Sequence, residues 1–218
     1  MPVPQPVPRV DRATMTDVFG EHRLMTVTED ALAGITHAPT RAFLAEVGLP
    51  DQTDSQGWFH RARDLDDEVR EKGYPEAAEK YPELAPGFHF DQWVSLGEIP
   101  YDALDLDATT GAVYASPAAG GAPYQLNSSL DVFAYLLCVV EAERPFYSAT
   151  AEQTLADGTT RRQVEARLEH LYGTPHTQLG PTPEARLRTT LQQTDPIALT
   201  TPDSTWHMVL RHITQGLD

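Results

Sequence analysis

The chain has 218 residues, of which 40% are apolar, and its 32 acidic and 16 basic side chains give a formal net charge of −16. This length suits one domain with extensions or two small domains, and it can bury a sizeable core. A single cysteine excludes an internal disulfide and a Cys-x-x-Cys motif, so we expect a reducing, cytoplasmic compartment. Neither a signal peptide nor an apolar run long enough to cross a membrane is present, so no membrane association is expected.

The negative charge is concentrated in the middle of the chain. Residues 64–143 carry 16 acidic and 3 basic side chains, whereas the segments on either side are nearly balanced. Such a region repels a phosphate backbone, so no nucleic acid partner is expected, and it attracts a basic protein. The alternative is a solvated acidic face with no partner.

The first third of the chain predicts short helices and one extended arm. Residues 1–10 alternate proline with Val or Gln, which predicts a disordered, proline-rich arm before a single domain over 11–218. Thr28 is placed to cap a helix over 29–34, and Pro39 opens a second helix that Gly48 and Pro50 end. A strand is expected to begin near 58–60. Residues 64–87 combine dense charge with Gly and Pro, which predicts a charged helical turn and a mobile loop.

From residue 91 the apolar pattern has a period of two, which is typical of strands. It predicts strands over 92–99, 101–107 and 111–116, with a tight turn from Asp107 to Gly111. An antiparallel meander is the simplest topology. Residues 117–125 are rich in Gly, Ala and Pro and predict a loop.

The most strongly predicted element is a helix that follows this loop. Ser128 at the N-cap and Asp131 three residues later form a capping box, and residues 132–140 are apolar almost all the way round. This helix should lie buried across the sheet. Narrow apolar stripes predict further helices over 161–172, 183–193 and 203–215, as a helical extension from about 148. The predicted fold class is therefore α+β, with a central antiparallel sheet, a buried helix across it and additional helices at both ends.

Motifs for nucleotide binding, nucleophilic catalysis and zinc proteolysis are absent from the sequence. Asp105 and Asp107 share one face of the second strand, opposite Leu104 and Leu106. Two close carboxylates can bind a divalent cation or divide acid and base roles between them. We expect instead that both side chains point to water beside the turn, and we therefore predict neither a cofactor nor a bound metal.

Three ordered motif sets resemble the SUKH superfamily of bacterial immunity proteins, and the likeness extends from about residue 19 to 216. The first two sets lie in the central sheet and at the start of the buried helix, and the third resembles the longer bacterial subgroup. They are Leu106-Asp107-x-x-Thr110-Gly111-x-Val113, then Asn127-Ser128-Ser129-Leu130-x-x-Phe133, and the upstream Thr36-His37-x-Pro39-Thr40-Arg41-x-Phe43-Leu44-x-x-x-Gly48-Leu49-Pro50 with the late Asp195-Pro196-x-Ala198-Leu199 followed by Trp206.

The resemblance implies an immunity protein that binds and neutralises a cognate polymorphic toxin, often a nuclease or a nucleotide-directed deaminase, with no catalysis of its own. An acidic surface suits the basic clefts of such toxins. The predicted partner-binding residues are Asp64, Asp66, Asp67, Asp105 and Asp107. Two alternatives stay open: a regulatory or scaffold module of the same fold, and a metal-dependent enzyme that uses Asp105 and Asp107.

Overall fold

The computed structural model describes residues 10–51, 57–62, 64–84, 86–99, 102–148 and 151–215. The predicted arm therefore lies outside the described residues except for its last position, Val10. That side chain is buried in the main hydrophobic core, which extends from Val10 to Ile213.

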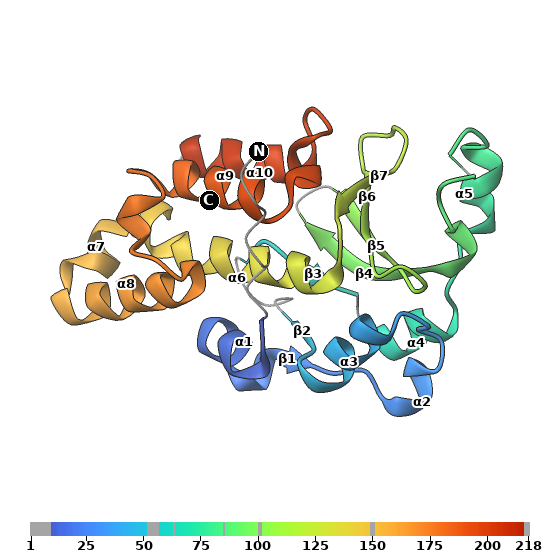
Figure 1. The fold of residues 1–218 in the computed structure, drawn as a ribbon, viewed down its shortest axis with the longest axis horizontal. Helices are drawn as coiled ribbons and strands as arrows, with labels where there is room; N and C mark the ends of the chain where they lie inside the picture. The colour runs from blue at the N-terminus through green and yellow to red at the C-terminus, as the bar shows by residue number, and fades with distance from the viewer. Residues whose placement is uncertain are drawn as a thin grey trace.

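Five strands form one antiparallel sheet in the order β3-β4-β5-β6-β7, and the predicted α+β class is confirmed (Figure 1). The strands are β3 (His60–Arg61), β4 (Trp93–Ile99), β5 (Asp102–Asp107), β6 (Val113–Pro117) and β7 (Tyr124–Asn127). The three predicted strands are present as β4, β5 and β6. Strand β7 was not predicted, because its residues fall at the end of a segment whose Gly and Pro content is typical of a loop.

A bulge in β4 allows the short strand β3 to approach closely. The register between β4 and β5 shifts between Ser95 and Gly97, and Gly97 has a φ of +131°. A Cβ at this position would lie 2.0 Å from the carbonyl oxygen of His60. Only glycine fits here, because both the backbone angle and the space exclude a side chain.

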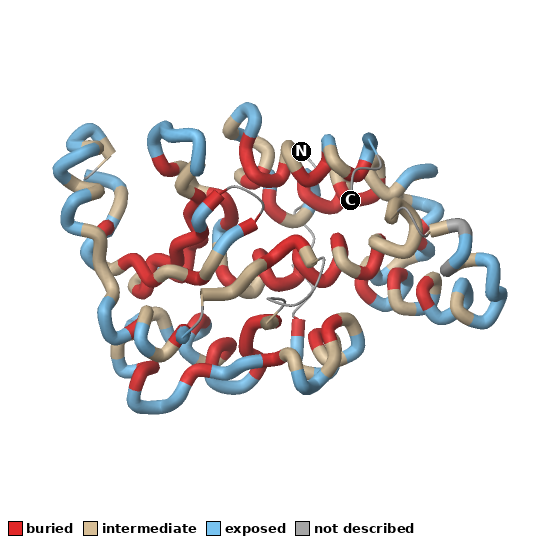
Figure 2. Tube along the Cα trace, turned by 180° about the vertical axis from the view of Figure 1, so that it is seen from behind, coloured by how far each residue is buried: buried red, intermediate tan, exposed pale blue. Residues whose placement is uncertain are grey.

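Helix α6 (Leu130–Tyr147) is buried on nearly all sides and contacts α1, α3, α7, α8, α9 and β7, as expected from its apolar circumference (Figure 2). Two details of its ends differ from the prediction. Its N-cap residue is Ser129, which makes no side-chain capping bond, so the capping box at Ser128 is wrong. The helix also continues through Pro145 to Tyr147, well beyond the apolar run.

Short N-terminal elements lie on one side of α6, and helices from the C-terminal third lie on the other side and at its end (Figure 1). The first group comprises α1 (Arg12–Phe19), η1 (Glu21–Arg23), α2 (Glu29–Leu32), α3 (Ala38–Glu46) and a two-stranded sheet of β1 (Leu24–Met25) and β2 (Leu49–Pro50). The second comprises α7 (Ala151–Ala156), α8 (Gly158–Tyr172), η3 (His176–Gln178), α9 (Pro183–Thr194), η4 (Pro196–Leu199) and α10 (Thr205–Gln215). Helices α8, α9 and α10 correspond to the three predicted C-terminal helices, and the Thr182 hydroxyl caps α9 as expected.

The charged segment 64–87 contains more structure than a helical turn and a loop. It forms α4 (Leu65–Arg70) and α5 (Pro75–Lys80), and η2 (Phe90–Gln92) follows. Apolar side chains of α5 and its flanks pack on a second cluster that lies apart from the main core. This cluster is formed by Phe90, Trp93, Ala112 and Tyr114. We call residues 73–84 the strap, because they cover the sheet face opposite α6.

Candidate functional site

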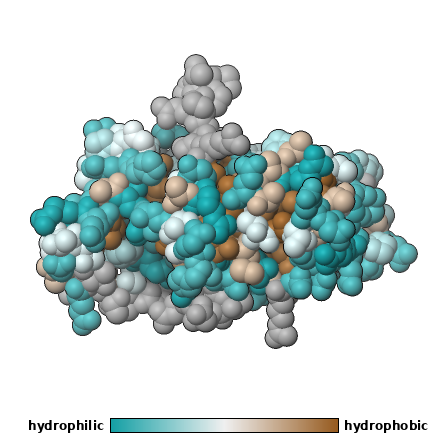
Figure 3. Space-filling view, turned by 90° about the horizontal axis from the view of Figure 1, so that it is seen from below, coloured by the Kyte–Doolittle hydropathy of each residue, from teal (hydrophilic) through white to brown (hydrophobic). Residues whose placement is uncertain are grey.

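Exposed acidic side chains gather on α2 and α4, which pack against each other. We call this surface the acidic face, and its exposed acids are Glu29, Asp30, Asp64, Asp67 and Glu71. The strap continues the negative charge with Glu76, Glu79 and Glu83, which are also exposed. Figure 3 views the side of the molecule on which α1 to α4 lie, and it shows mostly hydrophilic side chains with apolar atoms in the hollows between them.

The acids of α4 have different local roles. Asp64 is the N-cap of α4, and its carboxylate accepts a hydrogen bond from the Asp67 amide at 3.2 Å. Asp66 accepts bonds from the Thr28 hydroxyl at 2.6 Å and the Thr28 amide at 3.0 Å, which joins α4 to the start of α2. The Thr28 hydroxyl is the main reason that the pKa of Asp66 is lowered. Asp66 therefore holds α4 against α2, whereas Asp64 and Asp67 are exposed on the acidic face.

One arginine partly balances this charge. Arg70 lies 3.0 Å from the Asp67 carboxylate, 3.6 Å from that of Asp30 and 3.7 Å from that of Asp66. Its side chain is 44% exposed and that of Asp30 is 91% exposed, so water screens these contacts. A single cation shared among three carboxylates leaves the face negative.

Asp105 is buried beneath the strap, with 6% of its surface exposed, so the expectation that it points to water is wrong. Its carboxyl receives hydrogen bonds from the side chain of Tyr74 and, at 3.4 Å, from the Ser116 hydroxyl. Burial outweighs these bonds and raises the pKa of Asp105 to about 7.

Asp107 is also buried, with 1% exposed, and the expectation of water contact is wrong for it too. It holds the turn after β5: its Oδ1 accepts bonds from the Thr109 hydroxyl at 2.6 Å, the Thr109 amide at 2.8 Å and the Thr110 amide at 3.1 Å. Its Oδ2 lies 2.9 Å from Nδ1 of His89. Burial alone would raise the pKa of Asp107, but these hydrogen bonds, led by those from Thr109, lower it.

The two aspartates share a sheet face but have separate partners and opposite pKa shifts. Among the described residues, no group of three or more His, Cys, Asp or Glu side chains is arranged to hold a metal ion.

Several more acids of the middle segment are internal. Asp102 accepts bonds from Thr205 and Tyr124 at 2.7 and 3.1 Å, and Glu143 pairs with Arg186. The acids between residues 64 and 143 thus comprise exposed ones, most of them on α4 and the strap, and an inner set that holds the fold together.

A family model described as the SUKH-4 immunity protein matches residues 10–212. This match covers most of the chain. The chain belongs to the SUKH-4 immunity protein family. Membership of this family supports a role as an immunity protein and implies that the partner is a toxin. No curated protein and no solved structure matches the chain.

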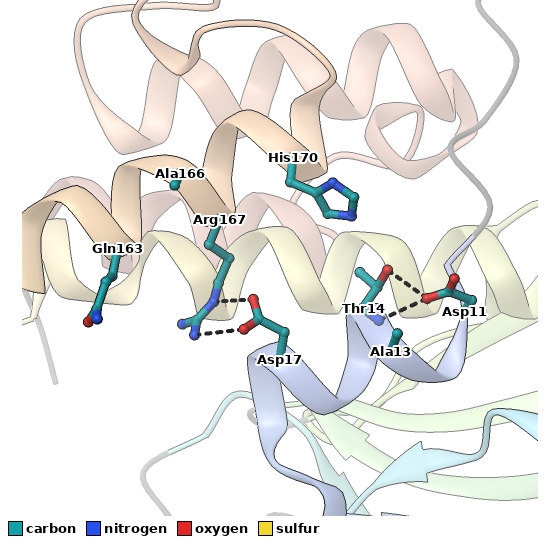
Figure 4. Close-up of a pocket in the computed structure, with 8 residues that line it drawn as sticks. All are labelled: Asp11, Ala13, Thr14, Asp17, Gln163, Ala166, Arg167 and His170. Atoms are coloured by element: carbon teal, nitrogen blue, oxygen red, sulfur yellow. Dashed lines mark hydrogen bonds and ion pairs between the residues drawn. The ribbon is translucent and has the colours of Figure 1, made fainter.

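Two surface grooves accompany the acidic face in this SUKH-4 protein. A groove of about 740 Å³ lies between α2 and α3, directly beside the acidic face. Its lining is apolar apart from Glu29 and Arg41, with Val27, Leu32, Ala33, Ala38, Ala42 and Ala45. A more polar groove of about 780 Å³ lies between α1 and α8, where Arg167 donates to Asp17 at 2.7 Å and joins the two helices (Figure 4).

The structure brings together only part of the predicted site. Asp64, Asp66 and Asp67 lie within one helical turn, whereas Asp105 lies beneath the strap and Asp107 lies at the turn after β5, against His89. Sequence reasoning missed Glu29 and Asp30, which join the acidic face through the contact between α2 and α4. Their position after Thr28 was visible, but the Thr28 side chain makes no capping bond to α2 and donates to Asp66, which no local pattern shows. Among the described residues, no helix is long and apolar enough to cross a membrane.

Proposed function

We propose that this protein binds a cognate polymorphic toxin through the acidic face and neutralises it in the cytoplasm, without catalysing a reaction. The observation that carries the proposal is the cluster of exposed carboxylates on α2 and α4 with Arg70 as the cation among them. Such a surface attracts a basic protein and fixes its orientation, because complementary potentials act before contact. The toxin class that suits it is one acting on nucleic acids or nucleotides, whose clefts are basic.

The apolar groove beside the acidic face supports the same proposal. Stable protein interfaces combine a desolvated apolar centre with a charged rim. The groove offers Val27 and Leu32 as its floor, and Glu29 lies in both the groove and the acidic face. We therefore expect the toxin to place an apolar side chain in the groove and basic side chains over α4.

The predicted contact residues divide accordingly. Asp64 and Asp67 are placed to contact a toxin directly, and Asp66 holds α4 against α2. Asp105 is covered by Tyr74 of the strap, and Asp107 holds the turn after β5, so we propose that both contribute to the fold and do not contact the toxin directly.

Co-expression tests the function as a whole. Candidate toxin domains from neighbouring reading frames are expressed with and without the protein, and for the cognate toxin we expect relief of growth arrest together with a purified complex. A stable complex with a cellular protein that is not a toxin would instead support the regulatory module. If neither growth relief nor a complex is observed, the proposal is wrong.

Association kinetics test the acidic face. For the purified pair, the association rate should fall as salt rises, and Asp67→Lys should lower it about tenfold at low salt. Glu169→Lys on the distant helix α8 makes the same change in net charge and is the matched control. Equal effects of both variants, or a rate that is independent of salt, would contradict the role of this surface.

The groove has its own pair of variants. Ala45→Trp places a bulky side chain in the groove between α2 and α3, and Ala166→Trp does so in the groove between α1 and α8. We expect the first to increase the dissociation rate and the second to leave it unchanged.

A further inference from the structure

Five carboxylates are buried among the described residues, and four of them have close hydrogen-bond partners. The five are Asp102, Asp105, Asp107, Glu143 and Asp195. Each of the other four accepts at least one bond of 2.8 Å or shorter, whereas Asp105 accepts a 3.4 Å bond from the Ser116 hydroxyl and a bond from the Tyr74 side chain, and the two do not offset its burial. Asp105 is thus the least well compensated buried acid of the described chain.

The strap that covers Asp105 is attached at its two ends. At its start, the Gly73 amide donates to the Trp93 carbonyl and the Tyr74 amide donates to the Phe90 carbonyl, both at 2.8 Å. At its far end, the Tyr81 hydroxyl donates to the Gly121 carbonyl at 2.6 Å, in the loop between β6 and β7. Between these points, α5 is only six residues long and has no fully buried side chain. The strap packs on the cluster of Phe90, Trp93 and Tyr114, which lies apart from the main core, so its opening exposes this cluster and leaves the main core folded.

We propose that the strap is a proton-dependent latch: it closes on the sheet when the Asp105 carboxyl is protonated and opens more readily when that carboxyl is ionised. A buried carboxylate without a cation is costly, and opening the strap returns it to water. The protonated carboxyl carries no charge, so it avoids this cost.

The groups that face Asp105 are consistent with this direction. Glu68 on α4 raises the pKa of Asp105, and its own pKa is raised by burial and then by the neighbouring acids Glu71, Asp67 and Asp64. Tyr74 on the strap is neutral, because burial raises the pKa of its hydroxyl. On the sheet, the neighbouring side chains in register are Ser95 and Tyr114, and burial also raises the pKa of Tyr114. The cation that precedes the strap, Lys72, donates to the Gly34 carbonyl at 2.7 Å.

The pH range follows from the two states of the carboxyl. In the closed state burial raises the pKa of Asp105 to about 7, and in the open state it returns toward the ordinary value of 3.8. The opening equilibrium constant should therefore rise by roughly tenfold per pH unit between these values and level off above the higher one. The strap is tightest in acid and loosens as the pH approaches neutrality.

Amide hydrogen exchange tests the latch on the whole protein without any toxin, so its outcome is independent of the proposed function. Exchange at Gly73 and Tyr74 is measured from pH 4 to 8 and corrected for the intrinsic pH dependence of exchange. We expect opening at these amides to need less free energy than at amides of α6, and to rise with pH as described. Asp105→Asn, which mimics the protonated acid, should remove the rise and keep the strap protected at pH 8.

Glu68→Gln gives a second, independent readout. Removing this negative charge should lower the pKa of Asp105 in the closed state, so the opening constant should level off at a lower pH. The latch is excluded if Asp105→Asn keeps the same pH dependence as the natural sequence. It is also excluded if the strap amides exchange only when those of α6 do, because the strap would then have no opening of its own.

Discussion

The Arg186 guanidinium and the Glu143 carboxylate form two parallel hydrogen bonds of 2.6 Å in the interior, where α9 packs on α6. The Tyr172 hydroxyl on α8 donates to the same carboxylate at 2.7 Å. Three helices are therefore joined at one buried acid, of which no surface is exposed. This geometry is bidentate, which is the strongest form of an arginine–carboxylate pair.

Breaking this pair should destabilise the protein severely. Glu143→Gln keeps an acceptor for Tyr172 but leaves the Arg186 charge without a counterion, so we expect a loss of about 3 to 5 kcal/mol in the free energy of unfolding. Urea unfolding followed by circular dichroism measures it. Arg188→Gln removes a partly exposed pair with Glu184 and should cost less than about 1 kcal/mol. Similar losses in both variants would contradict the role assigned to the buried pair.

Gly111→Ala should be costly because of both backbone and space. Gly111 has a φ of +78°, and a Cβ there would lie 2.3 Å from Nδ1 of His37 and 2.6 Å from the Thr40 hydroxyl. Gly173 has a similar φ of +64°, but no atom lies within 4 Å of its Cβ position. We expect about 1 kcal/mol for Gly173→Ala and at least about 2 kcal/mol for Gly111→Ala. The free energy of unfolding of each variant is measured by thermal and urea unfolding. The loss in Gly173→Ala reports backbone strain alone, and the loss in Gly111→Ala reports strain together with the steric clash.

Asp107→Asn should weaken the protein only where the carboxylate is ionised. The pKa of Asp107 is lowered in the folded state, so its stabilising contribution is present above its ordinary value of 3.8 and is lost as the pH falls through the lower, folded-state value. We expect a deficit of about 1 to 2 kcal/mol at pH 7 that disappears in strong acid. A deficit that stays constant over the whole pH range would show that shape, rather than charge, is what the turn requires.

Asp195→Ala should loosen the attachment of the C-terminal helices to the sheet. The Asp195 carboxylate accepts bonds from the Asn127 side chain at 3.0 Å and the Ser128 amide at 2.8 Å. Asn127 in turn accepts a bond from the Trp206 indole at 3.1 Å. The variant leaves buried donors unpaired and should cost about 2 kcal/mol, measured by urea unfolding. Asp195→Asn keeps an acceptor and should cost clearly less.

Local patterns were sufficient to predict the framework. The period-two run before Asp107 and the apolar circumference of α6 each depend on neighbouring residues alone, and both elements formed as expected. The turn that ends at Gly111 was predictable for the same reason, because glycine is the residue type that readily adopts a positive φ. The end of α6 was not predictable: Pro145 is normally a helix breaker, but the chain continues helically through it.

The site was harder to predict, because burial depends on contacts between distant segments. Alternation along β5 correctly placed Asp105 and Asp107 on the face opposite Leu104. It could not show that the strap covers that face, since the strap's charges and prolines are typical of a loop in water. Likewise, Ser128 donates its amide to Asp195, a residue 67 positions away. No local capping pattern contains that information.

The position of α6 has a consequence for how such a protein can diversify. Its side chains supply the interior to which most other elements attach, whereas the outward sides of α2 and α4 add little to that interior. Residues on those outward sides can be exchanged for others while the framework keeps its shape. The same scaffold can therefore adapt to a binding partner whose surface has changed, and this adaptation requires no substitution in the hydrophobic core.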